Sequence, residues 1–133
     1  MKQKISDEHR ALDALFTATR SQLKGEGDRE RARDAFDELH EALEAHLLAE
    51  EDLYYPTIWA VRPERKASLQ GFIHAHERFR ELLGEIAAKL ESGDLSDAAR
   101  ILETFQAEFA SHEVGEEEEL SSLDDEISAE VAR

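Results

Sequence analysis

The sequence predicts an all-α protein that folds as an up-down-up-down antiparallel four-helix bundle. Apolar residues recur at steps of three and four through four long segments, and only two prolines and six glycines interrupt the 133 residues. The connections between the segments are short, which makes successive helices antiparallel neighbours. No alternating strand pattern competes with the helical period.

The first two helices are separated by KGEGD, residues 24–28, in which Asp28 suits the N-cap of the second helix. Pro56 should bend or end the second helix, because proline lacks a backbone N–H. The inward stripe of the first helix comprises Ile5, His9, Leu12, Phe16, Thr19 and Leu23. That of the second comprises Phe36, Leu39, Leu43, His46, Glu50 and Leu53.

Pro63 suits the first turn of the third helix and Gly93 its end, while Asp94 or Ser96 caps the fourth. The third stripe comprises Leu69, Phe72 or Ile73, His76, Phe79, Leu83, Ile86 and Leu90. The fourth comprises Ala98, Leu102, Phe105, Phe109, His112, Glu116 and Leu120. We expect one domain over residues 1–133, with a core at about 5–120. The C-terminal tail 121–133 either extends the last helix or folds back on it.

The formal charge of −16 disfavours nucleic acid and anionic lipid surfaces as partners. No run approaches the roughly 20 apolar residues of a membrane span, and the N-terminus lacks an apolar export segment. We therefore expect a cytoplasmic protein without nucleic-acid or membrane partners, either a monomer or a homodimer. Cysteine is absent, so any metal site must use histidines and carboxylates.

Each of the four stripes carries a histidine where an apolar residue is expected. One such residue is most often a core histidine that hydrogen-bonds a neighbour, but four together favour a common site. Two of them have a glutamate four residues later on the same helix face, in HLLAE (46–50) and HEVGE (112–116). The candidate metal ligands are His9, His46, Glu50, His76, His112 and Glu116.

The distance of each histidine from one end of the bundle supports this set of candidate ligands. Counted from the end where the first helix turns into the second and the third into the fourth, the four histidines lie 16, 18, 17 and 16 residues deep. At about 1.5 Å per residue, they share a level to within roughly 3 Å. His74 points about 160° away from His76 and is expected at the surface, as is His40. For Tyr54 and Tyr55 we favour core packing over hydrogen bonding near a metal.

Imidazole and carboxylate donors without sulfur suit iron, manganese or zinc, and two carboxylates able to bridge suggest two ions. Two octahedral ions need about twelve positions, of which the side chains and a shared oxo or hydroxo bridge fill about ten. About two remain for an exogenous ligand such as dioxygen, nitric oxide or water. The arrangement therefore favours a site for binding or chemistry over a closed structural site.

The sequence resembles the hemerythrin-like, or HHE cation-binding, domain over roughly residues 5 to 120. The matching segments are DEHRAL (7–12), HLLAEEDLYYP (46–56), HAHERFRELL (74–83) and SHEVGEEEEL (111–120). The resemblance implies a hemerythrin-like bundle with two non-haem iron ions in an oxo- or hydroxo-bridged centre. Glu50 and Glu116 are the implied bridges, and the four histidines are the implied terminal ligands.

The classical oxygen carriers of that family have a second histidine on the third helix, where this chain has Phe72 and Arg80. The closer likeness is to four-histidine bacterial relatives. It implies binding of dioxygen, nitric oxide or peroxide, in oxygen or nitric oxide sensing or in iron handling, without a catalytic residue. Two alternatives stay open: a di-iron enzyme with ferroxidase, peroxidase or nitric oxide-reducing activity, and a metal-free structural bundle.

Overall fold

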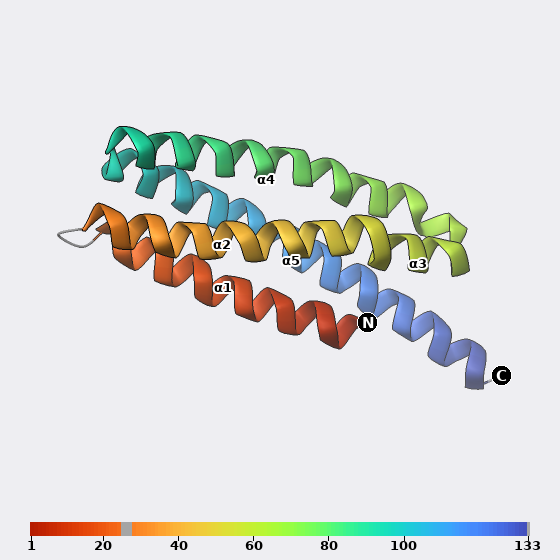
Figure 1. The fold of residues 1–133 in the computed structure, drawn as a ribbon. Helices are drawn as coiled ribbons and strands as arrows, with labels where there is room; N and C mark the ends of the chain where they lie inside the picture. Colours follow the sequence, from red (N-terminus) through yellow and green to blue (C-terminus); the bar gives the residue numbers. More distant parts are fainter. Residues whose placement is uncertain (25–27, 133) are drawn as a thin grey trace.

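The computed structural model describes residues 1–24 and 28–132, and it confirms the all-α four-helix bundle (Figure 1). The described residues contain no strand. The rods are α1 (Lys2–Lys24), α2 (Arg29–Ala49) continued by the π-helical turn η1 (Glu50–Tyr54) and by α3 (Tyr55–Val61), α4 (Lys66–Ser92) and α5 (Leu95–Ala132). A short 3-10 turn, η2 (Pro63–Arg65), joins α3 to α4.

The helices follow one another around the bundle in the order α1, α2, α4, α5. Helix α1 packs against α2 and α5, and α4 packs against α5 and α2. Helix α1 ends and α2 begins at the end of the bundle where α4 connects to α5, and the connection through η2 lies at the other end (Figure 1). This arrangement gives the predicted up-down-up-down topology.

Side chains and one glycine define the helix ends. The Asp28 carboxylate accepts a hydrogen bond from the Glu30 N–H (3.0 Å), as predicted for the N-cap of α2. Asp94, rather than Ser96, caps α5, since it accepts from the Asp97 N–H (3.0 Å). Gly93 ends α4 with φ +82°, a left-handed conformation that favours glycine. Of the first predicted turn, residues 25–27 lie outside the described residues.

Of the two outcomes predicted at Pro56, a bend or an end of the helix, the second is wrong: α3 continues through Pro56 to Val61. In the preceding π-helical turn, the Tyr55 N–H donates to the Glu50 carbonyl five residues back. The longer turn rotates the stripe, so that Leu53, predicted inside, is 57% exposed. Tyr54 and Tyr55 are buried in its place.

Two separate apolar clusters form the core. The larger one fills the half of the bundle toward the α4–α5 connection, around Phe16, Phe36 and Phe105. The smaller one lies toward η2 and comprises Ile5, Tyr54, Tyr55, Ile58, Leu69 and Leu120. In α1, α4 and α5, the inward histidine lies between the residues of one cluster and those of the other, and in the α2–η1 rod Glu50 does.

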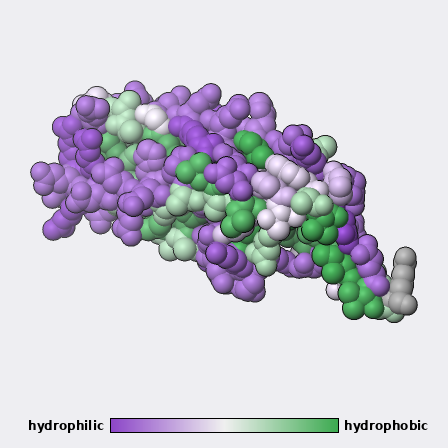
Figure 2. All heavy atoms as spheres, turned by 45° about the vertical axis from the view of Figure 1, so that its right-hand side comes forward, coloured by the Kyte–Doolittle hydropathy of each residue, from purple (hydrophilic) through white to green (hydrophobic). Residues whose placement is uncertain are grey.

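Of the two alternatives for the tail, the structure has the extension: α5 is helical to Ala132 and projects past the bundle (Figure 1). Arg65 pairs with Glu119 at 2.8 Å and with Glu126 at 2.6 Å, which ties the extension to η2. Figure 2 shows a mainly hydrophilic surface with apolar side chains at the C-terminal end of α5. Among the described residues, none of the helices has the length and apolar character needed to cross a membrane.

Candidate metal centre

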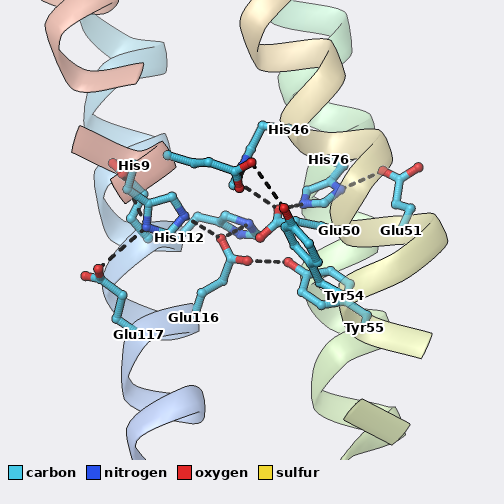
Figure 3. A network of polar contacts seen from close by, with 12 residues as sticks. His9, His46, Glu50, Glu51, Tyr54, Tyr55, His76, His112, Glu116 and Glu117 are labelled. Atoms are coloured by element: carbon cyan, nitrogen blue, oxygen red, sulfur yellow. Dashed lines mark hydrogen bonds and ion pairs between the residues drawn. The ribbon is translucent and has the colours of Figure 1, made fainter. Parts of the chain in front are cut away.

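The structure brings all six predicted side chains together in one layer between the two apolar clusters (Figure 3). Four rods contribute: α1, the α2–η1 rod, α4 and α5. All six residues are buried, with Glu50 and His76 at 0% exposure and His112 the most exposed at 9%. Helical periodicity accounts for this meeting, because each residue belongs to the inward stripe of its own rod.

Each of the two glutamates lies between histidines of two different rods. The Oε1 atom of Glu50 is 3.3 Å from the Nε2 atom of His46 and 3.2 Å from that of His76. The Oε1 atom of Glu116 is 3.4 Å from the Nε2 atom of His9 and 3.0 Å from that of His112. All four imidazoles therefore direct Nε2 toward a carboxylate at the centre of the layer.

These donor atoms form two overlapping groups, in each of which all atoms lie within 4.8 Å of one another. The first group contains His9, His46, Glu50 and Glu116, and the second contains Glu50, His76 and His112. Two groups that share a carboxylate are the arrangement expected for two neighbouring cations.

Whether these atoms have hydrogen-bond partners tests whether a cation fits among them. Nine buried side-chain nitrogen and oxygen atoms lack a hydrogen-bond partner within the described part of the chain, and eight of them belong to the six candidate ligands. They include Nε2 of all four histidines, both oxygens of Glu50 and Oε1 of Glu116. An unpartnered buried polar atom costs about 1–3 kcal/mol, whereas a bound cation uses such atoms as donors. The residues therefore fit a metal centre.

Burial also sets the protonation of the layer. It lowers the pKa of His76 to about 4 and lowers the pKa of His46 as well, so both rings are neutral near pH 7. Burial, followed by the neighbouring Glu116, raises the pKa of Glu50. A neutral imidazole offers a nitrogen lone pair to a cation. The cation in turn offsets the carboxylate charge that burial disfavours.

Carboxylates outside the centre hold two of the rings. The Nδ1 atom of His46 is 3.1 Å from Glu8, and the Nδ1 atom of His76 is 2.6 Å from Glu51. An ionised carboxylate only accepts, so each Nδ1 carries the proton and each Nε2 lone pair faces inward. Arg80 donates to Glu51 at 2.9 Å. Although burial opposes it, hydrogen bonds from Arg80 and His76 lower the pKa of Glu51.

The two tyrosines of η1 and α3 do more than pack, so core packing alone was the wrong interpretation. Tyr55 is 2% exposed, and its hydroxyl donates to Oε2 of Glu116. The Tyr54 hydroxyl donates to Glu8 at 3.2 Å. Both residues still belong to the smaller apolar cluster. The alternative interpretation, hydrogen bonding near the centre, therefore describes Tyr55.

The remaining predicted residues lie as follows. The His74 side chain is 85% exposed, as predicted, and His40 is partly buried against Phe36, away from the layer. Periodicity did not identify Glu8 and Glu51 as partners of histidines, or Arg80 as a partner of Glu51, because each pairs with a residue of another rod. For Glu51, the doubled glutamate Glu50-Glu51 was the available signal.

Comparison with known families supports the metal-binding interpretation of this geometry. Residues 2–123 match the family described as Hemerythrin HHE cation binding domain, which covers most of the chain. Comparisons with curated proteins and with solved structures find no match.

We expect metal removal to loosen the end of the bundle near η2 more than the opposite end. Without cations, the unpartnered polar layer separates the smaller apolar cluster from the larger one, and local opening is cheapest where few apolar contacts hold. Hydrogen exchange followed by mass spectrometry should show faster exchange after chelation in residues 54–72 than in residues 79–109. Uniform acceleration along the chain would contradict this coupling.

Glu113 should make the metal-free protein sensitive to pH. It is 6% exposed, and burial, followed by Asp13, raises its pKa from 4.5 to about 9. The folded state therefore keeps a proton that the unfolded chain releases, and the resulting stabilisation is complete below pH 4.5 and lost as pH rises toward 9. Glu113→Gln should remove this slope, of at most about 1.4 kcal/mol per pH unit.

The measurement is thermal unfolding of metal-free protein at pH 5, 7 and 9. The melting temperature of the wild type should fall relative to that of Glu113→Gln as pH rises. Glu118→Gln, at an exposed position of the same helix, is the matched control and should follow the wild type. Parallel curves for the wild type and Glu113→Gln would show that Glu113 is ionised in the fold.

Proposed function

Because the chain belongs to the hemerythrin HHE cation-binding domain family, we propose that it holds two non-haem iron ions and binds a small diatomic ligand, dioxygen or nitric oxide, at that centre. One observation carries the proposal: six buried side chains from four rods converge with eight nitrogen and oxygen atoms that lack partners among the described residues. Such a layer destabilises an apolar core, because its polar atoms are buried without partners, but its nitrogen and oxygen atoms suit a metal ion.

The residues divide naturally between two ions. His9 and His46 would serve one ion, and His76 and His112 would serve the other, with carboxylates between them. Imidazole and carboxylate donors accept iron, manganese and zinc, and we choose iron because the resemblance of the four motifs implies a di-iron centre. When bound, ferrous ions with open positions would supply the electrons and the binding site for a diatomic molecule.

The protein's own groups prepare this site. The Glu8 and Glu51 carboxylates fix the tautomers of His46 and His76, so neither ring must reorganise before donating. Aromatic rings cover His112: those of Phe72 and Phe79 lie 5.4 Å and 5.1 Å from its ring. These rings line a groove that reaches His112, so a small apolar molecule would approach that histidine along apolar side chains.

Glu116→Ala should abolish most iron binding, since it removes a carboxylate that lies between His9 and His112. Elemental analysis after reconstitution should give two irons per chain for the wild type and less than one for the variant. Glu118→Ala changes an exposed glutamate of the same helix and should keep both ions. Two irons retained by Glu116→Ala would argue strongly against the proposed ligand set.

Oxygen exposure of the reduced, iron-loaded protein distinguishes binding from turnover. A binding protein should show a stoichiometric change in absorption that reverses when oxygen is removed under argon. An oxygen electrode should then record no oxygen consumption beyond that of ferrous iron alone when excess ferrous iron is supplied, and peroxide added to the protein should not be consumed. Sustained protein-dependent consumption of oxygen or of peroxide would favour an enzyme and contradict the proposed binding role.

A further inference from the structure

We propose that Asp13, Glu113 and Glu117 form an outer cation position on the solvent side of His9, and that the metal centre is loaded through it. The position lies at the seam between α1 and α5. It is outside the layer of six candidate ligands and shares only His9 with that layer. This inference rests on the proposed function, because it assigns the route by which the proposed iron ions reach their ligands.

The His9 ring provides the first observation. The Nδ1 atoms of His46 and His76 each contact a carboxylate. The Nδ1 atom of His9 is buried and lacks a hydrogen-bond partner within the described part of the chain, and the side chain is only 4% exposed. This atom lies 3.6 Å from Oε2 of Glu113 and 3.7 Å from Oε1 of Glu117. Two donors of one ion, each at about 2.1 Å, lie roughly 3–3.6 Å apart, so the spacing is close to that around a cation.

Helical periodicity assembles the outer position. Ser6, His9 and Asp13 recur at steps of three and four along α1. Glu113 and Glu117 lie four residues apart on α5, which packs against α1. The Ser6 hydroxyl donates to Glu117 at 2.7 Å, and Asp13 lies close enough to Glu113 to raise its pKa. Glu117 contacts His9 from the side away from the centre of the layer (Figure 3).

Negative charge leads along this seam to His9. Within residues 1–24 and 28–132, no lysine or arginine forms an ion pair with Glu113 or Glu117. A groove of about 660 Å³ continues the seam along α5, and its charged lining residues are Glu117, Glu118, Asp125 and Lys2. Carboxylates in a groove raise the local concentration of cations and speed their arrival.

The other three seams of the bundle offer an entering cation less. Between α2 and α4, the Arg80 guanidinium lies beside the carboxylate that contacts His76. Between α4 and α5, the groove is lined by aromatic rings, and Arg78 there pairs with Glu108 at 3.5 Å. Between α1 and α2, the groove is lined mainly by alanine and leucine, and its carboxylate already contacts His46. A hydrated cation exchanges water for oxygen donors as it enters, and the α1–α5 seam supplies them.

The single lone pair of the His9 ring makes the outer position temporary. A neutral imidazole has one nitrogen lone pair, because the other nitrogen carries the proton. While the centre is empty, Nδ1 can hold the lone pair and contribute to the outer position. When Nε2 serves the centre instead, Nδ1 carries the proton and donates toward Glu113 or Glu117, so the outer position loses a donor. A cation that contacts Glu113 also displaces the proton that this carboxyl keeps in the metal-free fold.

Stopped-flow mixing of metal-free protein with Co²⁺ tests the route, because Co²⁺ takes the same donors as ferrous iron and absorbs visible light when bound. Glu117→Gln and Asp13→Lys change side chains that solvent reaches, so both variants should fold. Both should slow the appearance of the absorption, Asp13→Lys on the order of ten-fold, because an ammonium group replaces a carboxylate on the path. The final absorbance at saturating Co²⁺ should equal that of the wild type, since all six ligands remain.

Glu108→Gln and Glu108→Lys are the matched controls. They make the same charge changes at the α4–α5 seam, where the Glu108 side chain is 42% exposed, and should load at nearly the wild-type rate. Equal slowing in these controls would show that overall charge sets the rate, and it would overturn the inference. Unchanged rates in Glu117→Gln and Asp13→Lys, or a lower final absorbance, would overturn it as well.

Equilibrium titration with ferrous iron under anaerobic conditions separates this inference from the proposed function. The wild type and Asp13→Lys should each bind two ions per chain. A third ion retained by the wild type would contradict a temporary outer position while leaving the di-iron proposal intact. Failure of the wild type to bind any iron would overturn the proposed function, and the inference with it.

Discussion

Burial of imidazoles and carboxylates in the middle of an apolar bundle is the constraint on which the rest of this structure depends. A typical unpartnered buried polar atom costs about 1–3 kcal/mol, and this layer contains eight atoms without a partner in the described ranges 1–24 and 28–132. Protonation relieves part of the cost, which is why burial and Glu116 raise the pKa of Glu50. Cations relieve it further, because every inward atom then gains a partner of opposite charge or a lone-pair acceptor. The layer also divides the core, so the cohesion of the η2 end depends on what the layer binds.

The geometry of the layer is fixed from outside by charges on neighbouring rods. His46 of α2 is held by Glu8 of α1, and His76 of α4 is held by Glu51 of η1. Arg80 keeps Glu51 ionised and therefore a pure acceptor. Each of these histidines has one nitrogen directed to a fixed carboxylate and the other to the centre. Such partners reduce the reorganisation that accompanies metal binding, and they tie the site to the packing of the rods.

Much of the fold and of the candidate site follows from the sequence, because both depend on the period of single helices. The stripe of α1 places His9 in phase with Leu12 and Phe16, and equal depth places it level with the other three histidines. Partners across rods could not be obtained in this way. Glu8 adjoins His9 in sequence but contacts His46, since its direction depends on the rotation of α1 against α2. No local pattern specifies that rotation.

The π-helical turn shows why the role of Tyr55 was missed. In a regular α-helix, positions 50 and 55 point about 140° apart, so a tyrosine at 55 would not face the layer that Glu50 enters. One π-helical turn aligns residues five apart and directs the Tyr55 hydroxyl toward Glu116. The same turn moves Leu53 outward and carries the helix past Pro56. A local irregularity in one rod thus decides which side chain of that rod donates to the buried carboxylate of α5.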